Sequence, residues 1–565
     1  MKAKCSRKAM LILTFNYSIS ILPLFSLFLV ITFELQLGES LPLSTSGSWV
    51  VDTISGQRVK LRCVNWAAHL PTVVPEGLDR QPVEAIAVKI TSLGFNCLRL
   101  TWATYMWTKK RYANLAIVDS LDSLGLHDAA AGIARNNLRI LGMTVREAYD
   151  AVVQAAADAG LMLVLDNHVS RPMWCCSEDD GNGFFGDADF DMAEWIRGLQ
   201  IVALRFKNTP EVVGISLRNE LRGKRQSNEI WHKNIALGCV TIHQTNPDLL
   251  VIVSGLSYDN DLSFLRRHPL RLGFSGKLVY EVHSYAFTDG HRQDWALKPL
   301  APLCASMARE FDERAGFLVR GSAGTPLFVS EFGGDQRGIN RGDNRFLSCF
   351  LTLAAEMDLD WAIWALQGSY YIRKGRIGDE EMFGVLDKDW EEPRNPHFHQ
   401  RYGLVQHMLR DPLLTADYGY EIIYHAGSGR CLVVDDRGNV QLGDCERRSR
   451  WWYGGKGNAR ASPIILMDKG LRFCLGAVGE ENPVTLTNLS GVRGVTEWSI
   501  RMVSGFPFQI VGEVEEGEKA RDLCLELDGT NSTIVFARDC ICLEGPNCLS
   551  DPRPQWFVFI SANAR

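Results

Sequence analysis

Short apolar runs alternate with longer amphipathic segments between Val59 and Met408 of this 565-residue chain. Each run is too apolar to face water on either side, which is typical of a parallel strand covered on both faces. Segments with helical periodicity stand between the runs, for example residues 148–160, 190–206 and 344–357. The runs are VKLRCVNW (59–66), FNCLRLTW (95–102), LMLVLDNH (161–168), VVGISLRNE (212–220), LLVIVSG (249–255), KLVYEVHSY (277–285), PLFVSEFG (326–333) and DWAIWAL (360–366).

Eight strands alternating with helices favour one fold class. Such a pattern over about 350 residues predicts an α/β protein of the (β/α)8 type, a TIM barrel. The alternative is a doubly wound open sheet, but no glycine-rich phosphate loop follows the first strand. Gly94 and Gly160 stand where two predicted helices would end. We therefore predict a barrel domain over residues 45–412.

Polar and aromatic side chains recur where the predicted strands end, and the carboxyl ends of barrel strands are where chemistry collects. Glu220 and Glu331 each close an apolar run, where a carboxylate is costly unless it is needed. Paired carboxylates at such a rim are what glycosidic-bond cleavage requires. Taken singly, each strand-end residue has an ordinary structural explanation, but burial does not explain the whole set. The others are Trp66, His69, Arg99, Trp102, Asn167, His168, Asn219, His283, Tyr285 and Trp364.

In this ordered set the chain resembles glycoside hydrolase family 5, a cellulase-like group of retaining (β/α)8 enzymes. The resemblance extends over roughly residues 48–408. Leu221 is a departure, because many members have proline after the first glutamate. The resemblance rests on Arg99 in CLRLTW, His168 in DNH, Asn219 and Glu220 in RNE, His283 and Tyr285 in HSY, Glu331 in SEFG, and Trp364 on the last strand.

The resemblance implies a double-displacement mechanism without metal or organic cofactor. Glu331 would be the nucleophile and Glu220 the general acid/base, with their carboxyl groups about 5–5.5 Å apart. The six other residues would support them. Arg99 and Tyr285 would keep Glu331 charged, and His283 would orient Glu220. Asn219 would bind the sugar 2-hydroxyl, His168 would support sugar hydroxyls or Arg99, and Trp364 would stack on a sugar ring.

Other aromatic residues near the predicted rim are candidates for further sugar subsites, with ordinary packing as the equal alternative. They are Trp66, Trp102, Trp107 and Trp174. The acidic, glycine-rich segment 174–190 follows the third strand, and it could form a wall of the cleft.

Beyond Pro412 the helical pattern stops, and a repeat of about fifty residues follows over residues 417–565. The units, at 429–452, 471–498 and 521–556, carry Cys-Leu near the start and close on Trp. They resemble a ricin B-type β-trefoil lectin module, and the resemblance implies a carbohydrate-binding domain. That resemblance implies disulfides Cys431–Cys445 and Cys524–Cys540. In the second unit Asn488 takes the place of the second cysteine and leaves Cys474 unmatched. Sugar binding stays open, since the tryptophans also fit a hydrophobic core.

The first forty residues are excluded from the fold. Basic residues precede an apolar stretch from Met10 to about Phe33, the order found in a secretory signal. We predict a cleaved signal and a secreted, extracellular protein without stable membrane insertion, with an uncleaved signal anchor as the alternative. Secretion permits disulfides among the remaining fourteen of fifteen cysteines.

The net charge of -6, without a basic tract, argues against nucleic acid as a partner.

The predicted function is therefore hydrolysis of a β-linked glycan, of glucan or mannan type, by a monomer. One alternative is a non-catalytic lectin built on a barrel that has lost activity, but both glutamates and their supporters are present. Another is a transglycosylase that uses the same residues. The exact substrate, and endo or exo action, are not fixed by the sequence.

Overall fold

The computed structural model describes residues 41–288, 290–320, 324–414, 419–455, 461–468, 473–480, 482–488, 494–516, 519–529, 532–545, 548 and 550–564. The predicted signal over residues 1–40 lies outside the described residues. Among the helices of the described part, none combines the length and apolarity needed to cross a membrane.

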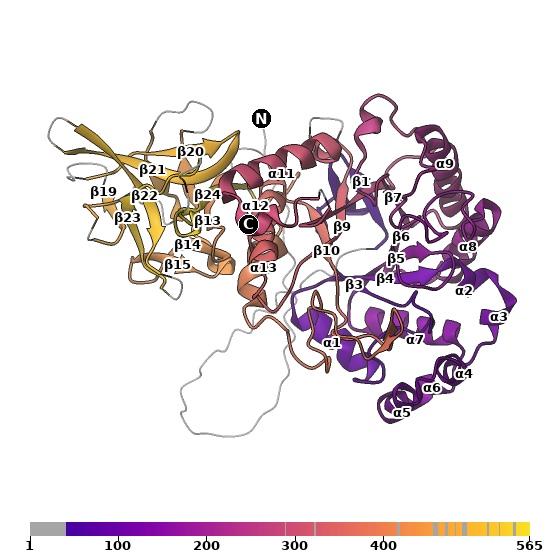
Figure 1. The fold of residues 1–565 in the computed structure, drawn as a ribbon. Coiled ribbons are helices and arrows are strands. Elements are labelled where there is room, and N and C mark those ends of the chain that lie inside the picture. The colour runs from indigo at the N-terminus through magenta and orange to yellow at the C-terminus, as the bar shows by residue number, and fades with distance from the viewer. Residues whose placement is uncertain are drawn as a thin grey trace, which may run out of the picture. The chain divides into compact units, whose positions relative to one another are not determined.

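Eight parallel strands close into a barrel, so the predicted TIM barrel is confirmed and an open sheet is excluded (Figure 1). Neighbours around the ring follow the order β10-β3-β4-β5-β6-β7-β8-β9, and every neighbouring pair is parallel. Each strand coincides with one of the eight apolar runs. They are β3 (Arg62–Trp66), β4 (Cys97–Ala103), β5 (Met162–Val169), β6 (Val212–Ser216), β7 (Leu250–Ser254), β8 (Leu278–Tyr285), β9 (Leu327–Gly333) and β10 (Asp360–Ile363).

The strands are buried on both faces because alternate side chains enter two different apolar clusters. Val164 and Ile252 belong to a cluster that also contains Leu43 and Val50. These last two come from the hairpin β1 (Leu43–Ser46) and β2 (Trp49–Asp52), which the sequence did not predict. The neighbouring residues of the same strands pack in the larger cluster that includes the helices. This double burial explains why the runs lack a polar face.

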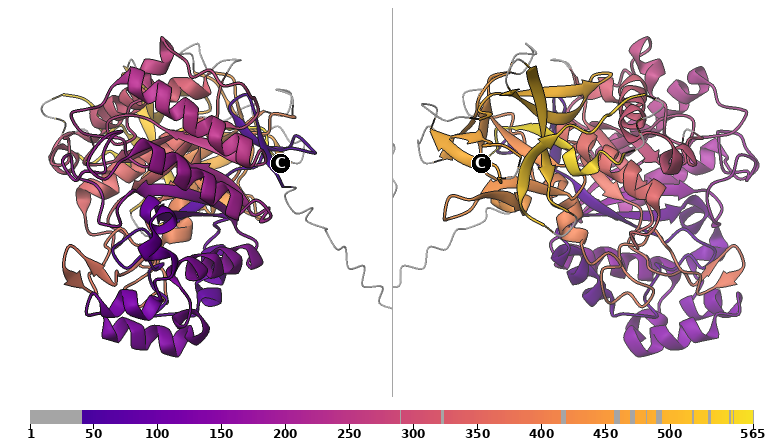
Figure 2. Two further views of the ribbon diagram at one scale, coloured as in Figure 1. Left: turned by 90° about the vertical axis from the view of Figure 1, so that its right-hand side faces the viewer. Right: turned by 60° about the vertical axis from the view of Figure 1, so that its left-hand side comes forward.

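Helices cover the barrel and agree with the predicted amphipathic segments (Figure 2). Helix α7 begins with a capping box in which Thr144 and Glu147 satisfy each other's backbone N–H groups. Gly160 follows its end with φ +80°, a conformation that favours glycine. The covering helices are α1 (Val83–Ser92), α7 (Val145–Asp158), α8 (Met192–Arg205), α9 (Asn228–Thr245), α11 (Leu300–Arg314), α12 (Arg341–Met357) and α13 (Phe398–Gln406).

Short elements fill the connections. Residues 104–141 after β4 fold into five short helices. The short elements are α2 (Thr104–Thr108), α3 (Lys110–Ala113), α4 (Ile117–Asp122), α5 (His127–Asn136), α6 (Leu138–Leu141), η1 (Ser263–Arg266), α10 (Asp294–Leu297), η2 (Gly316–Val319), β11 (Ile372–Arg373) and β12 (Arg376–Ile377).

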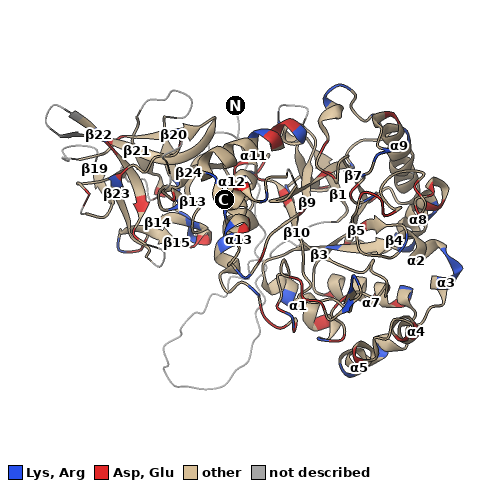
Figure 3. Cartoon of the chain, viewed as in Figure 1, with Lys and Arg blue, Asp and Glu red and all other residues tan. Residues whose placement is uncertain are grey.

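Acidic and basic residues are interspersed along the described elements (Figure 3). One of the buried ion clusters is centred on Asp358 at the end of α12, which accepts hydrogen bonds from Arg58 and from Lys60 Nζ, the latter at 2.6 Å. Burial acts to raise the pKa of Asp358, but Lys60 and Arg58 lower it to about 2. The cluster joins the segment before β3 to the segment before β10.

The C-terminal region is all-β and antiparallel, as predicted, in two sheets. One has the order β15-β14-β13-β16-β17-β18-β19 with β24 paired to β13, and the other has the order β20-β21-β22-β23. Its elements are β13 (Tyr420–His425), β14 (Arg430–Val434), β15 (Val440–Gly443), η4 (Cys445–Arg447), β16 (Trp451–Tyr453), β17 (Ile464–Leu466), β18 (Phe473–Gly476), β19 (Thr485–Asn488), β20 (Trp498–Val503), β21 (Phe506–Glu516), β22 (Lys519–Leu527), β23 (Val535–Asp539), η6 (Arg553–Gln555) and β24 (Phe557–Ala562).

The closing tryptophans of the repeats are core residues. Trp451, Trp498 and Trp556 are fully buried. The indole N–H of Trp451 donates to the Leu432 carbonyl, and that of Trp498 donates to the equivalent Leu475 carbonyl. The packing interpretation of these tryptophans is therefore confirmed, whereas the trefoil and lectin assignment stays a prediction.

The disulfides agree with the pairing implied by the repeat. Cys431–Cys445 and Cys524–Cys540 are bonded, and Cys474 is free and buried, as expected. Further disulfides that the sequence did not predict are Cys63–Cys97, Cys175–Cys176, Cys304–Cys349 and Cys542–Cys548.

Candidate functional site

A pocket of about 1330 Å³ opens at the carboxyl ends of the barrel strands. Its lining residues come from several strand ends and the loops that follow them. Seven of the eight predicted site residues line it, whereas Arg99 is buried and lies outside the lining. The predicted residues in the lining are His168, Asn219, Glu220, His283, Tyr285, Glu331 and Trp364, so that only Arg99 of the predicted set is absent from it.

Glu220 lies in the loop four residues beyond β6, rather than on the strand as the sequence pattern predicted. Its backbone takes φ +46°, a left-handed conformation that is uncommon outside glycine. Two buried side chains hold this turn: Asp259 Oδ2 accepts from the Glu220 N–H at 2.9 Å, and Arg222 Nη1 donates to the Glu220 carbonyl at 2.7 Å. The strained backbone is therefore fixed from both sides, and the partly exposed carboxyl group is directed to the pocket.

Glu331 lies within β9 and is 5% exposed. Arg99 Nη1 donates to its Oε1 at 2.9 Å, and the Tyr285 hydroxyl donates to its Oε2 at 2.9 Å. A cation and a hydroxyl thus hold the two carboxylate oxygens in fixed positions, which is the arrangement predicted from the sequence.

His283 links the two glutamates. Its Nδ1 lies 3.1 Å from Glu220 Oε1 and 3.7 Å from Glu331 Oε2, and its Nε2 lies 3.6 Å from Asp259 Oδ2. One oxygen of each glutamate and a ring nitrogen of His283 all lie within 4.8 Å of one another. The two carboxyl groups therefore converge on one point of the pocket, although 111 residues separate them in the sequence.

Both glutamates have perturbed acidity. Burial raises the pKa of Glu220 to about 7, with Arg222 and Arg99 acting in the opposite direction. Burial also raises the pKa of Glu331, and the charges of His283 and Arg99 oppose that increase. Burial lowers the pKa of His283. The Glu220 carboxyl group can thus hold or release a proton near neutral pH.

Asn219, His168 and Trp364 lie beside the glutamates. Arg99 Nη2 donates to Asn219 Oδ1 at 3.2 Å, so one guanidinium positions both Asn219 and Glu331. His168 Nδ1 lies 2.6 Å from Asp166 Oδ2, and the His168 ring stacks on Trp364 with centroids 5.5 Å apart. These contacts fix the orientation of a polar and an aromatic side chain that face the pocket.

Sequence reasoning missed the buried acids around Arg99. Arg99 Nη2 lies 3.0 Å from Asp166 Oδ1 and 3.6 Å from Glu281 Oε2. Ser216 also donates a hydrogen bond to Glu281. A carboxylate within an apolar strand was the available signal, since Asp166 interrupts LMLVLDNH and Glu281 interrupts LVYEVHSY.

Three of the four additional aromatic candidates follow the packing alternative. Trp66, Trp102 and Trp107 are at most 3% exposed and belong to the apolar cluster that joins the strands to the helices. Trp174 does line the pocket, where its ring meets Tyr370 edge-on at 5.6 Å. The segment after β5 thus contributes to the pocket wall, as expected for residues 174–190.

Two groups of described residues have the proximity that a metal ion requires, and neither is assigned to one. Cys175, Cys176 and Glu220 form the first group, but the two cysteines are bonded to each other and offer no thiolate. The second group is Glu220, His283 and Glu331, in which His283 Nδ1 is hydrogen-bonded to Glu220 Oε1 and the oxygens of Glu331 accept from Arg99 and Tyr285.

Comparisons with known proteins identify relatives of this chain. A family model described as Cellulase (glycosyl hydrolase family 5) matches residues 55–369, which is more than half of the chain. A glycosyl hydrolase 5 family protein of Chamaecyparis obtusa is 42% identical over 533 residues, which cover 93% of this chain and 94% of the relative. An endoglucanase of Paenibacillus polymyxa is 21% identical over 369 residues, or 62% of this chain and 84% of the relative.

Solved structures share the barrel fold. The catalytic domain of the major endoglucanase from Xanthomonas campestris pv. campestris superimposes with a TM-score of 0.51 at 21% identity, over 64% of this chain and 98% of that domain. An endocellulase from Pyrococcus horikoshii, solved with cellotetraose, gives a TM-score of 0.51 at 19% identity, over 64% of this chain and 97% of its own.

Proposed function

Because the chain belongs to glycosyl hydrolase family 5, we propose that it is a retaining β-glycosidase that hydrolyses a β-linked glucan. The observation that carries the proposal is the approach of Glu220 and Glu331, with carboxylate oxygens within 4.8 Å of each other. Retaining enzymes hold the two carboxyl groups about 5–5.5 Å apart, whereas inverting enzymes need about 6.5–9.5 Å to admit a water molecule. The close approach of one oxygen from each glutamate agrees with the shorter, retaining separation and supports direct attack by a carboxylate on the anomeric carbon.

Glu331 would be the nucleophile. Its two oxygens accept from Arg99 and Tyr285, so its negative charge is stabilised and one lone pair can be directed to the anomeric carbon. Attack would break the bond to the leaving oxygen and give a covalent glycosyl-enzyme ester on Glu331.

Glu220 would be the general acid and then the general base. A pKa of about 7 lets a protonated carboxyl group give its proton to the leaving oxygen. The resulting carboxylate would then take a proton from the water that hydrolyses the ester, which restores both groups. His283, 3.1 Å from Glu220, would orient the carboxyl group between these steps.

Sugar binding beside the glutamates would fall to Asn219, His168 and Trp364. The Asn219 amide would donate to the sugar 2-hydroxyl, a contact that strengthens in the oxocarbenium-like transition state. Trp364 would stack against a sugar ring. Its orientation is fixed by the stack with His168.

A chain of several sugar units is the substrate that the pocket supports best. Its volume of about 1330 Å³ exceeds the roughly 300–1,000 Å³ of most small-molecule sites. The similar proteins include endoglucanases, and this favours a glucan over a mannan as the substrate.

The C-terminal region would hold the enzyme on its polysaccharide as a ricin B-type lectin module. Trp452 is 46% exposed, while Trp451 beside it is buried, so one aromatic ring of the closing pair in the first unit is available for a sugar. Tethering would raise the local substrate concentration. We also propose that the protein is a secreted monomer, in keeping with its many disulfides.

The test is a substrate panel with the purified wild type and the Glu331→Gln variant. We expect wild type to release sugar from β-glucan or its oligosaccharides, with the β-anomer as first product by NMR, and the variant to release none. Release from neither protein, with both folded and binding polysaccharide equally, would favour a non-catalytic lectin. Longer oligosaccharides among the products would instead identify transglycosylation.

A further inference from the structure

Two adjacent cysteines form part of the pocket wall. Cys175 and Cys176 are bonded to each other, and both line the pocket together with Trp174. Cys175 is 9% exposed and Cys176 is partly exposed. The other disulfides at the barrel, Cys63–Cys97 and Cys304–Cys349, are fully buried. A disulfide that served only to stabilise the fold would have no need to line the pocket.

The sulfur atoms lie next to the groups that would bind and cleave the sugar. The amide nitrogen of Asn219 lies 3.8 Å from the sulfur of Cys175 and 3.8 Å from that of Cys176. A carboxylate oxygen of Glu220 lies within 4.8 Å of both sulfurs. Any sugar unit that reaches Asn219 and Glu220 must therefore pass beside the disulfide.

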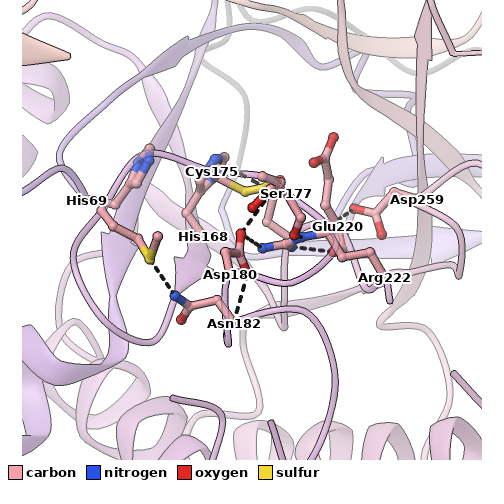
Figure 4. The surroundings of a disulfide bond; sticks show 12 residues. His69, His168, Cys175, Ser177, Asp180, Asn182, Glu220, Arg222 and Asp259 are labelled. Atoms are coloured by element: carbon pink, nitrogen blue, oxygen red, sulfur yellow. Dashed lines mark hydrogen bonds and ion pairs between the residues drawn. A yellow bond between two sulfur atoms is a disulfide. The ribbon is translucent and has the colours of Figure 1, made fainter. Parts of the chain in front are cut away.

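The segment that carries the disulfide is fastened to the turn that carries Glu220 (Figure 4). Arg222, which is fully buried, donates to the Ser177 carbonyl at 3.0 Å, to the Glu220 carbonyl at 2.7 Å and to Asp180 Oδ2 at 2.6 Å. Asp180 Oδ2 also accepts from the Ser177 N–H at 3.0 Å. Arg222 thus fixes the position of the disulfide segment relative to the Glu220 turn through three hydrogen bonds.

A bonded cysteine pair presents a surface unlike that of two thiols. Its sulfur atoms are polarizable, apolar and without a hydrogen-bond donor, so they can pack against the C–H groups of a sugar. Two thiols would rotate independently and would add weak S–H donors beside Asn219.

We propose that the disulfide between Cys175 and Cys176 is a sugar-contacting wall of the catalytic cleft, which packs against the sugar unit held by Asn219 and Glu220. This inference rests on the proposed glycosidase function. It assigns substrate contact to two residues that the family resemblance did not include.

The test removes this disulfide and leaves the acid and the nucleophile unchanged. The double variant Cys175→Ser, Cys176→Ser is compared with wild type and with Cys542→Ser, Cys548→Ser, which removes a disulfide from the C-terminal region. On the β-glucan oligosaccharide that wild type hydrolyses, we expect kcat/KM to fall about tenfold in the first variant, chiefly through KM, and to stay within twofold in the control. Circular dichroism and melting temperature establish that each variant is folded.

A redox titration gives a second measurement that needs no variant. Dithiothreitol should reduce the pocket disulfide before the buried ones, with thiols located by alkylation and peptide mass spectrometry. We expect KM of the wild type to rise in step with reduction of Cys175 and Cys176. An unchanged KM in both the folded variant and the reduced wild type would overturn the inference. Wild type without activity on any substrate would instead refute the proposed function.

Discussion

Replacing Glu220 with glutamine is expected to make the protein more stable than wild type at alkaline pH. Burial raises the pKa of Glu220 from an ordinary 4.5 to about 7 in the folded protein. Above pH 7, folding must therefore keep a charged carboxylate in a site that disfavours it. Glutamine has similar shape and carries no charge, so the variant escapes this cost at the expense of the acid/base group.

The sign and size follow from proton linkage. Between pH 4.5 and 7 the folded protein retains a proton that the unfolded chain has released, so the free energy of unfolding falls as pH rises. The slope is about 1.4 kcal/mol per pH unit, which accumulates to about 3 kcal/mol over this interval. Relative to wild type, Glu220→Gln should gain that amount from pH 4 to pH 8, or about 3 °C in melting temperature for a chain of this size.

Differential scanning calorimetry of both proteins from pH 4 to pH 8 measures the effect. Glu229→Gln, at an exposed position of α9, is the control for removal of a carboxylate outside the pocket. A melting-temperature difference for Glu220→Gln that is constant, or that grows toward acid pH, would refute the assignment of a raised pKa to Glu220.

Three further outcomes are expected. The basic limb of the kcat/KM profile should lie near pH 7, because Glu220 must hold its proton, and it should be read from initial rates between pH 4 and pH 9. Tyr285→Phe should lower kcat about 10- to 100-fold by removing the hydrogen bond to Glu331, with little change in melting temperature. Asp358→Asn should cost about 3–5 kcal/mol in urea unfolding, since it removes the carboxylate that pairs with the buried Arg58 and Lys60, whereas a cost below 1 kcal/mol would contradict this.

The barrel could be predicted because its strands are buried on both faces. A strand such as β7, LVIVS, has no residue that water could solvate, so its sequence is compatible with few other environments. The hairpin β1–β2 has only short, mixed segments, and its position at the barrel depends on contacts with Val164 and Ile252 far along the chain. Local sequence carries no signal for such contacts.

The two glutamates could be predicted, and several of their partners could not. Glu220 and Glu331 each follow apolar residues, so the sequence itself indicates that a carboxylate is placed where burial disfavours it. Asp259 lies in a loop of ordinary polar composition, SYDND, and its contact with the Glu220 N–H arises only in three dimensions. Trp66 and Trp102, which the sequence left open between packing and sugar contact, are packed, because a strand-end tryptophan can point to the helices as readily as to the pocket.

The central claim is that Glu331 forms a covalent bond to the sugar during turnover. A 2-deoxy-2-fluoro-β-glucoside with a good leaving group slows both steps and lets the intermediate accumulate, so the intact protein and its peptides can be weighed by mass spectrometry. The account predicts one fluorosugar per protein, located on the peptide that contains Glu331, and no label on the Glu331→Gln variant. A label on another residue, or turnover with an inverted anomeric product and no adduct, would contradict it.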